Sequence, residues 1–205
     1  MRRKIDIALK KNAKQQRAVA TVAAIVEAAT YILSHDGPGG FTANKVAEKA
    51  GVNIASFYQY YPNKEALLFH IIRLNWESQL AKLTPILTRP GPDHAAKLRA
   101  FIQEFFLIEA AETGLRQALR AASVELRDTP EFQDLIATGA ELTRGFLKSA
   151  ILVEDTDELD FVVDFIVLLT TSFAERSTDA HTSSARLIRQ ADLLTDMLIT
   201  QFKIS

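Results

Sequence analysis

The 205-residue sequence contains no cysteine, which excludes a disulfide bond and a thiolate nucleophile. A chain of this length buries about 70% of its unfolded surface, so a hydrophobic core can hold it without a disulfide or a structural metal. Hydrophobic residues make up 48% of the sequence and charged residues 24%, as in ordinary globular proteins. This composition excludes extended disorder.

Long hydrophobic runs are also missing. The densest apolar stretch, Phe161 to Phe173, is shorter than the roughly 20 residues that span a bilayer, and it contains Asp164. The basic residues at the amino terminus are followed by further lysines and not by the apolar segment of a secretion signal. We therefore expect no membrane-spanning helix and a cytoplasmic location.

Motifs for catalysis are absent from the sequence as well. The four histidines are scattered, and no His-x-x-x-His or Glu-x-x-His pair exists. The sequence has neither a Gly-x-Ser-x-Gly nucleophile turn nor a glycine-rich phosphate loop. We therefore predict that the protein is not an enzyme, and that it has no catalytic residue, no metal site and no cofactor.

The net charge of −1 hides an uneven distribution of charge. Residues 1–70 hold ten Lys and Arg against five Asp and Glu, whereas residues 71–205 hold fourteen against twenty. We expect residues 1–14 to form a basic flexible arm. Such an arm is either a solvated tail or a contact for a polyanion such as DNA. The excess lies mostly in seven residues: Arg2, Arg3, Lys4, Lys10, Lys11, Lys14 and Arg17.

Three helices are predicted within the first sixty residues. Apolar residues recur at helical spacing from Gln15 to His35, and the glycines and proline of residues 37–40 end this pattern. Thr42 can cap a short second helix, and Gly51 stands where a left-handed turn follows it. A third short helix, capped by Asn53, is expected to run through Tyr60.

The rest of the chain also reads as helical. A fourth helix begins near Asn63, and Thr88 to Asp93 is the clearest linker. No segment shows a strand pattern with turn chemistry, so we predict an all-α fold with domains at residues 15–62 and 63–205. Further helices are expected around residues 98–108, 115–127, 130–152, 161–174 and 185–198.

The second and third helices with their glycine turn are typical of a helix-turn-helix motif, in which the second helix of the pair lies in the DNA major groove. Small residues such as Ala47 and Ala50 let the two helices cross closely. Exposed tyrosines beside Lys64 favour DNA binding over a plain core hairpin, because exposed aromatic surface is costly unless it contacts something. The side chains expected to face outward are Asn53, Ser56, Gln59 and Tyr60.

The sequence resembles the tetracycline-repressor (TetR) family over roughly residues 15–72. This resemblance implies an amino-terminal helix-turn-helix domain joined to a larger helical ligand-binding and dimerisation domain. It also implies a transcriptional regulator that responds to a ligand, more commonly as a repressor. The matching residues are Thr42, Val46-Ala47, Ala50-Gly51-Val52, Phe57-Tyr58, Tyr60-Tyr61, Asn63-Lys64-Glu65 and Leu67-Leu68.

The resemblance also implies roles at the DNA. Hydroxyl and ammonium groups suit phosphate contacts, apolar side chains can pack on a thymine methyl, and Asn53 could pair with adenine. Asn44 stands where many family members have an arginine, and Lys45 beside it is a candidate phosphate contact. The basic arm is expected to touch phosphates or the minor groove. The implied phosphate contacts are Thr42, Tyr58, Tyr60 and Lys64, and the implied base contacts are Asn53, Ile54, Ala55 and Ser56.

A single recognition helix reads only a few base pairs, so two half-sites about 34 to 36 Å apart require a dimer. By resemblance, the last two helices pair with their copies in a four-helix bundle. The alternative is that their apolar stripe is core within one chain. The predicted interface residues are Val162, Ile166, Leu169, Phe173, Ile188, Ala191, Leu194 and Leu198.

By the same resemblance, the helices from Asp93 to Leu152 would enclose a cavity for a small apolar or amphipathic effector that releases the DNA. Glu104, Glu109 and Glu125 are candidate polar anchors. Aromatic residues at helical spacing are also typical of an ordinary core, and a protein that binds DNA without an effector, or a nucleoid-associated protein, is the alternative function. The predicted ligand contacts are Trp76, Phe101, Phe105, Phe106, Leu119 and Phe132.

Overall fold

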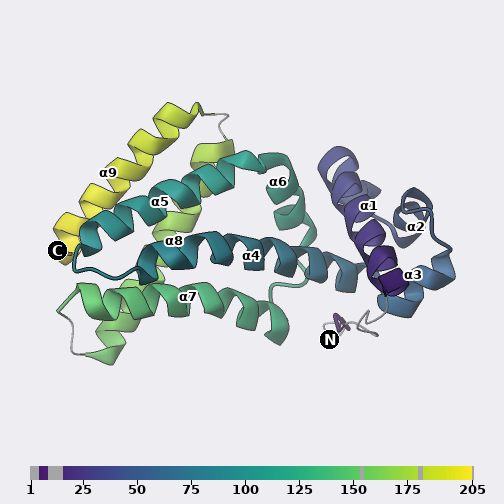
Figure 1. Ribbon diagram of the computed structural model, residues 1–205, viewed down its shortest axis with the longest axis horizontal. Helices are drawn as coiled ribbons and strands as arrows, with labels where there is room; N and C mark the ends of the chain where they lie inside the picture. Colours follow the sequence, from purple (N-terminus) through teal and green to yellow (C-terminus); the bar gives the residue numbers. More distant parts are fainter. Residues whose placement is uncertain (1–4, 9–15, 153–154, 180–181, 205) are drawn as a thin grey trace. The chain divides into compact units, whose positions relative to one another are not determined.

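The computed structural model describes residues 5–8, 16–152, 155–179 and 182–204. Within these ranges it contains nine helices and no strand, which confirms the all-α fold (Figure 1). Most of the predicted basic arm lies outside the described residues, namely Arg2, Arg3, Lys4, Lys10, Lys11 and Lys14.

The chain divides into two compact units. Unit 1 comprises residues 1–76 and 114–133, and unit 2 comprises residues 77–113 and 134–205. Helix α4 (Lys64–Thr88) begins in unit 1 and ends in unit 2. The sequence placed the domain boundary at residue 62. In the structure the division falls within α4, because the first turns of α4 group with the amino-terminal helices.

Unit 1 is built on α1 (Gln16–Gly40), α2 (Ala43–Lys49) and α3 (Ile54–Tyr60), with the start of α4 and most of α6 (Thr113–Ala122). Helix α1 packs on α2, and α2 packs on α3. At Gly37 the backbone leaves helical geometry with φ of 66°, where the sequence predicted the break. Fully buried side chains of this unit include Ile25, Ile32, Leu33, Val46, Phe57, Tyr61 and Leu67.

Helix α1 is long and apolar enough, by length and composition alone, to cross a membrane. The core helix of a soluble protein passes the same test. In this chain α1 provides Ile25, Ala29 and Ile32 to the core of unit 1, each at most 2% exposed. These three apolar residues are therefore used in packing against the rest of the unit.

Unit 2 contains the end of α4 together with α5 (His94–Ala111), most of α7 (Pro130–Ala150), α8 (Thr156–Asp179) and α9 (Ser184–Phe202). Helix α5 packs against both α8 and α9. Arg99 of α5 forms ion pairs with Asp192, at 3.1 Å, and with Asp196 of α9. The core of this unit includes Leu98, Ile102, Phe106, Leu147, Val163, Leu187 and Ala191.

Most helix boundaries agree with the sequence, but α6 ends at Ala122 and not near Arg127. The hydroxyl of Ser123 donates to the carbonyl oxygen of Arg120 at 3.2 Å. Serine hydroxyls compete in this way with regular helical hydrogen bonds.

The predicted dimer residues need correction, because the structure buries most of them inside unit 2. Val162, Ile166, Ala191, Leu194 and Leu198 are each at most 3% exposed in the single chain. Helix α8 is apolar on both faces, and periodicity alone does not tell which face meets its own chain. The remaining predicted residues, Leu169, Phe173 and Ile188, are half-buried.

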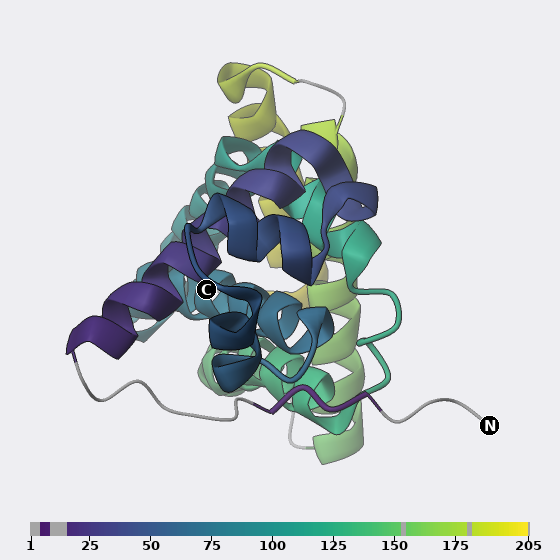
Figure 2. The same cartoon turned by 90° about the vertical axis from the view of Figure 1, so that its right-hand side faces the viewer.

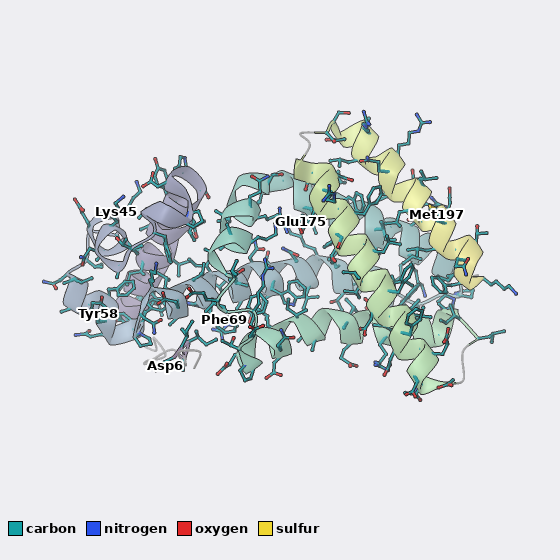
Figure 3. All side chains as sticks on the ribbon, turned by 180° about the vertical axis from the view of Figure 1, so that it is seen from behind. Asp6, Lys45, Tyr58, Phe69, Glu175 and Met197 are labelled. Atoms are coloured by element: carbon teal, nitrogen blue, oxygen red, sulfur yellow. The ribbon has the colours of Figure 1, made fainter. Side chains whose placement is uncertain are left out.

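The outer faces of α8 and α9 carry a different set of large apolar side chains. Phe161, Phe165 and Leu168 follow one another at helical spacing on α8, while Leu193 and Met197 do so on α9. Figure 3 shows α8 and α9 next to each other, with Met197 labelled on α9. We call these five exposed residues the α8/α9 apolar surface.

Candidate nucleic-acid interface

The first candidate contact is Thr42, which caps α2. Its Oγ1 accepts a hydrogen bond from the backbone N–H of Lys45 at 3.3 Å, as the sequence predicted. Because the oxygen acts as the acceptor in this bond, the hydroxyl hydrogen can be donated outward to a phosphate oxygen. Lys45 in the same turn is exposed.

The turn between α2 and α3 depends on Gly51, whose φ is 65°. The next residue, Val52, donates its N–H to the carbonyl oxygen of Ala47 at 3.0 Å, which closes the end of α2. A side chain disfavours this left-handed backbone, so glycine fits the position. The turn sets the angle at which α3 leaves α2, and the predicted helix-turn-helix geometry is confirmed.

The third helix begins at Asn53, whose Oδ1 accepts from the N–H of Ala55 at 2.8 Å. This bond confirms the predicted cap. A two-bond pairing with adenine would need the same oxygen to accept from the base. The capped geometry therefore favours a contact in which the Asn53 amide nitrogen donates to a purine N7 or to a phosphate oxygen.

The predicted contact residues differ in exposure. On α3, Ala55 and Tyr58 are exposed, while Ile54 and Ser56 are half-buried. Figure 3 labels Lys45 and Tyr58 on one edge of unit 1. The structure thus brings donors from α2 and α3 to the same edge. The exposed candidates are Thr42, Asn44, Lys45, Asn53, Ala55, Tyr58 and Lys64.

The expectation that Tyr60 faces outward is wrong. Tyr60 is only 8% exposed, because positions 57 and 60 lie on the same face of α3 and Phe57 is buried. Tyr61 is buried as well, so that Tyr58, 45% exposed with its ring against Phe57, is the exposed tyrosine of this group. The argument from exposed tyrosines therefore applies to Tyr58 alone.

Tyr61 has a structural partner that the sequence did not reveal. Its hydroxyl lies 2.7 Å from Nδ1 of His70, and the Tyr61 ring packs near both the His70 and Phe57 rings. Burial raises the pKa of the Tyr61 phenol well above its usual value, and the nearby charge of Arg73 opposes this effect only in part. The Tyr61 phenol is therefore neutral, and its contact with His70 joins the end of α3 to α4.

The start of α4 forms the third side of the candidate interface. Asn63 caps this helix, since its Oδ1 accepts from the N–H of Ala66 at 2.7 Å. Lys64 is exposed in the first turn. A helix amino terminus with an adjacent lysine attracts phosphate groups. Donors from α2, α3 and α4 thus make a surface suited to DNA.

The predicted ligand contacts are placed separately in the two units. Trp76, Leu119 and Phe132 belong to unit 1, and the three phenylalanines belong to α5 in unit 2. Phe106 is completely buried, and its ring packs edge-on against Phe173 of α8. Phe106 is thus a core residue, in agreement with the alternative that aromatic residues at helical spacing belong to an ordinary core. Phe105 is 9% exposed, and Phe101 is half-buried.

The candidate anchors for a ligand also differ in exposure. Glu109 of α5 is buried, Glu104 is half-buried, and Glu125 is exposed to solvent after α6. Glu109 is thus the one of the three carboxylates whose position fits an enclosed site.

Comparison with known proteins finds a family that is similar over the residues of the candidate interface. Residues 25–71 match the family described as bacterial regulatory proteins, tetR family. This range contains α2, α3 and the candidate contact residues. No curated protein gives a significant match to the sequence.

Several solved structures share the fold over nearly the whole chain. A TetR-like transcriptional regulator from Rhodococcus sp. has a TM-score of 0.65 and 19% identity, covering 90% of this chain and 96% of that chain. The fatty acid degradation regulator FadR from Bacillus halodurans has a TM-score of 0.70 and 17% identity, with coverages of 95% and 100%. FadR from Bacillus subtilis, solved in complex with stearoyl-CoA, has a TM-score of 0.70 and 17% identity, with coverages of 86% and 97%. At these identities the likeness is one of fold.

Proposed function

We propose that this chain, a member of the TetR family of bacterial transcriptional regulators, is a cytoplasmic repressor that binds a palindromic operator as a homodimer. A small apolar or amphipathic effector releases it. The observation that carries the proposal is the set of exposed hydrogen-bond donors on α2, α3 and the start of α4. Such donors fix a helix-turn-helix domain on the DNA backbone while α3 meets the bases.

Each donor has a proposed role. Thr42 and Lys45 hold phosphates on one side of the groove, and Tyr58 and Lys64 hold phosphates on the other. Between them, Ala55 and Ile54 present apolar surface to a thymine methyl, and the other two candidates on α3, Asn53 and Ser56, donate or accept at base edges.

The α8/α9 apolar surface supports the proposed homodimer. Leu168 is 66% exposed and Phe161 is 64% exposed, and both point away from the core of unit 2. A second copy of this chain offers the same surface. When a two-fold axis relates the two copies, each surface covers the other and the assembly is closed as a dimer. We propose that α8 and α9 pair with their copies through this surface.

The proposed effector is apolar or amphipathic because its candidate contacts are mostly aromatic or aliphatic. One solved structure of the same fold holds stearoyl-CoA, a molecule with a long acyl chain and a polar head group. We propose that effector binding shifts α4, whose first residues include Lys64 and whose later residues belong to unit 2. Such a shift would move the two recognition helices off the spacing of the operator.

The test begins with selection of bound duplexes from a random DNA pool at about 0.15 M salt. Affinities for the selected duplex and a scrambled duplex are then measured for the wild type, Lys64→Ala and two tyrosine variants. Tyr58→Phe and Tyr61→Phe remove the same hydroxyl group from an exposed and from a buried ring. We expect Tyr58→Phe and Lys64→Ala to weaken operator binding, and Tyr61→Phe to lower stability without weakening binding by the folded protein.

A palindromic selected sequence with this order of effects supports the proposal. Equal binding of the selected and the scrambled duplex would overturn operator recognition and favour a nucleoid-associated protein. Once an operator is known, acyl-CoA esters of increasing chain length are added to the complex of the protein with this operator, and release of the DNA is measured. If no apolar or amphipathic compound of a screened set releases the DNA, the effector part of the proposal fails.

A further inference from the structure

Three exposed residues form the outward face of α3. Tyr58 and Gln59 follow Ala55 by three and four positions, so the three side chains lie on one side of the helix. Phe57 and Tyr60, on the other side, are buried in unit 1. Figure 2 views unit 1 from the side where α2 and α3, in dark blue, lie at the front.

Gln59 is the member of this face that has no role in the proposed function. Ala55 is proposed to meet a thymine methyl, and Tyr58 a phosphate. The Gln59 side chain is exposed, and its amide makes no hydrogen bond with any residue that the structure describes. Both the donor and the acceptor of this amide are therefore available to a ligand.

The chemistry of this amide fits adenine. In the major groove adenine presents the N7 acceptor beside the N6 amino donor, and glutamine matches this pair when Nε2 donates to N7 and Oε1 accepts from N6. Asn53 carries the same group, but its Oδ1 already accepts from the N–H of Ala55 at 2.8 Å. Ser56 is half-buried and has a single hydroxyl. Gln59 is thus the side chain of this helix that offers both halves of an amide.

Gln59 also lies farther along α3 than the residues proposed to meet the bases. A helix rises about 1.5 Å per residue, so Gln59 is about 6 Å beyond Ala55 along the axis. Base pairs follow one another about every 3.4 Å along the duplex, so this distance corresponds to roughly two base pairs when α3 follows the groove. A glutamine here reaches a base pair beyond those that face the start of the helix.

We propose that Gln59 determines operator specificity by pairing with one adenine in each half-site through two hydrogen bonds in the major groove. This inference rests on the proposed operator binding and names a base that one side chain reads. A good two-bond pair favours its own base over another by about 5-fold to 150-fold in affinity. Because Gln59 is uncharged, its contribution depends on the base sequence and not on salt.

The test compares the duplexes that the wild type, Gln59→Ala and Gln59→Arg select from a random pool. We expect the wild type to select an A·T pair at one position of each half-site, and Gln59→Ala to accept any base pair there while it selects the same bases elsewhere. Gln59→Arg should select G·C at that position, because arginine pairs with O6 and N7 of guanine. Alanine and arginine both favour helices, so α3 should remain intact.

Affinity measurements separate the reading of a base from a general loss of binding. When G·C replaces the A·T pair in both half-sites, the wild type should bind about 5-fold to 150-fold more weakly for each half-site, whereas Gln59→Ala should bind both duplexes equally. The slope of log affinity against log salt should be the same for these two proteins. Lys64→Ala, which removes a proposed phosphate contact, should weaken binding to both duplexes alike and lower this slope.

Gln133→Arg is the matched control, since it makes the same change at an exposed position of α7 and should select the wild-type sequence. The proposal is overturned if Gln59→Ala keeps the wild-type preference at every position, or if the preference that it loses is not for A·T. Equal weakening of Gln59→Ala on all duplexes would also overturn it, since Gln59 would then act through the fold or the phosphates. A wild type that selects no sequence would instead contradict the proposed function, and the pairing with adenine would fail with it.

Discussion

Replacing Leu168 by alanine tests the homodimer at the α8/α9 apolar surface. Leu168 is 66% exposed in the single chain, so a partner could remove about two-thirds of its surface from water. Full burial of a leucine side chain contributes about 1.5 to 3 kcal/mol. Each copy would then contribute about 1 to 2 kcal/mol.

The two-fold symmetry of a dimer doubles this contribution, because each substitution appears in both copies. The expected loss is about 2 to 4 kcal/mol per dimer, which raises the dissociation constant by roughly 30-fold to 700-fold. Leucine and alanine both favour helices, so α8 itself should remain intact. Sedimentation equilibrium over a wide range of protein concentrations measures the change.

Leu152→Ala is the matched control, since it removes the same side chain from a fully exposed position in unit 2. We expect it to leave the dissociation constant unchanged. If Leu168→Ala dimerises as tightly as the wild type, Leu168 is not part of the interface. If Phe161→Ala also dimerises normally, the α8/α9 apolar surface is not where the copies meet.

Two further predictions concern stability. Gly51→Ala should lower the free energy of unfolding by about 1 to 2 kcal/mol, because alanine must adopt φ near 65° there although its Cβ meets no neighbour. Gly145→Ala inside α7, where the added Cβ also meets no neighbour, should raise the free energy of unfolding by about 0.5 to 1 kcal/mol. Urea unfolding measures both changes, and equal effects of the two substitutions would refute the backbone argument. Burial raises the pKa of Tyr61 in the folded state, so its contribution to stability is complete below about pH 10, the pKa of an exposed tyrosine, and is lost as the pH rises beyond it. Tyr61→Phe should remove this part of the loss of stability at alkaline pH, as measured by the free energy of unfolding from pH 8 to 11. If the slope of that free energy against pH is the same in the variant and the wild type, the assignment to Tyr61 is wrong.

Local sequence signals predicted the helix-turn-helix well, since caps and turns depend on neighbouring residues. Thr42 and Asn53 cap their helices through bonds that span two or three residues, and Gly51 has the left-handed backbone that the sequence indicated. Such features require only the residue type and its position beside a helix end. The resemblance to the TetR family rested on the same residues.

Burial was harder to predict wherever more than one face of a helix is apolar or aromatic. Tyr58 and Tyr60 have similar chemistry, yet only Tyr58 is exposed, because Tyr60 shares the face of Phe57. On α8, the sequence selected Val162 and Ile166 for the interface, whereas the structure exposes Phe161 and Leu168. Periodicity gives the relation between residues on one helix but not the direction in which that helix meets its neighbours.

The sequence by itself determined the order of helices, the caps of α2 and α3, the glycine turn and the choice of candidate phosphate contacts. These depend on interactions between residues close along the chain. Only the tertiary structure decided that Asn63 holds Asp6, that Tyr61 meets His70, and which apolar face of α8 stays exposed. Those contacts join residues that are distant in sequence or lie on different helices, so they are defined only when the elements pack against one another.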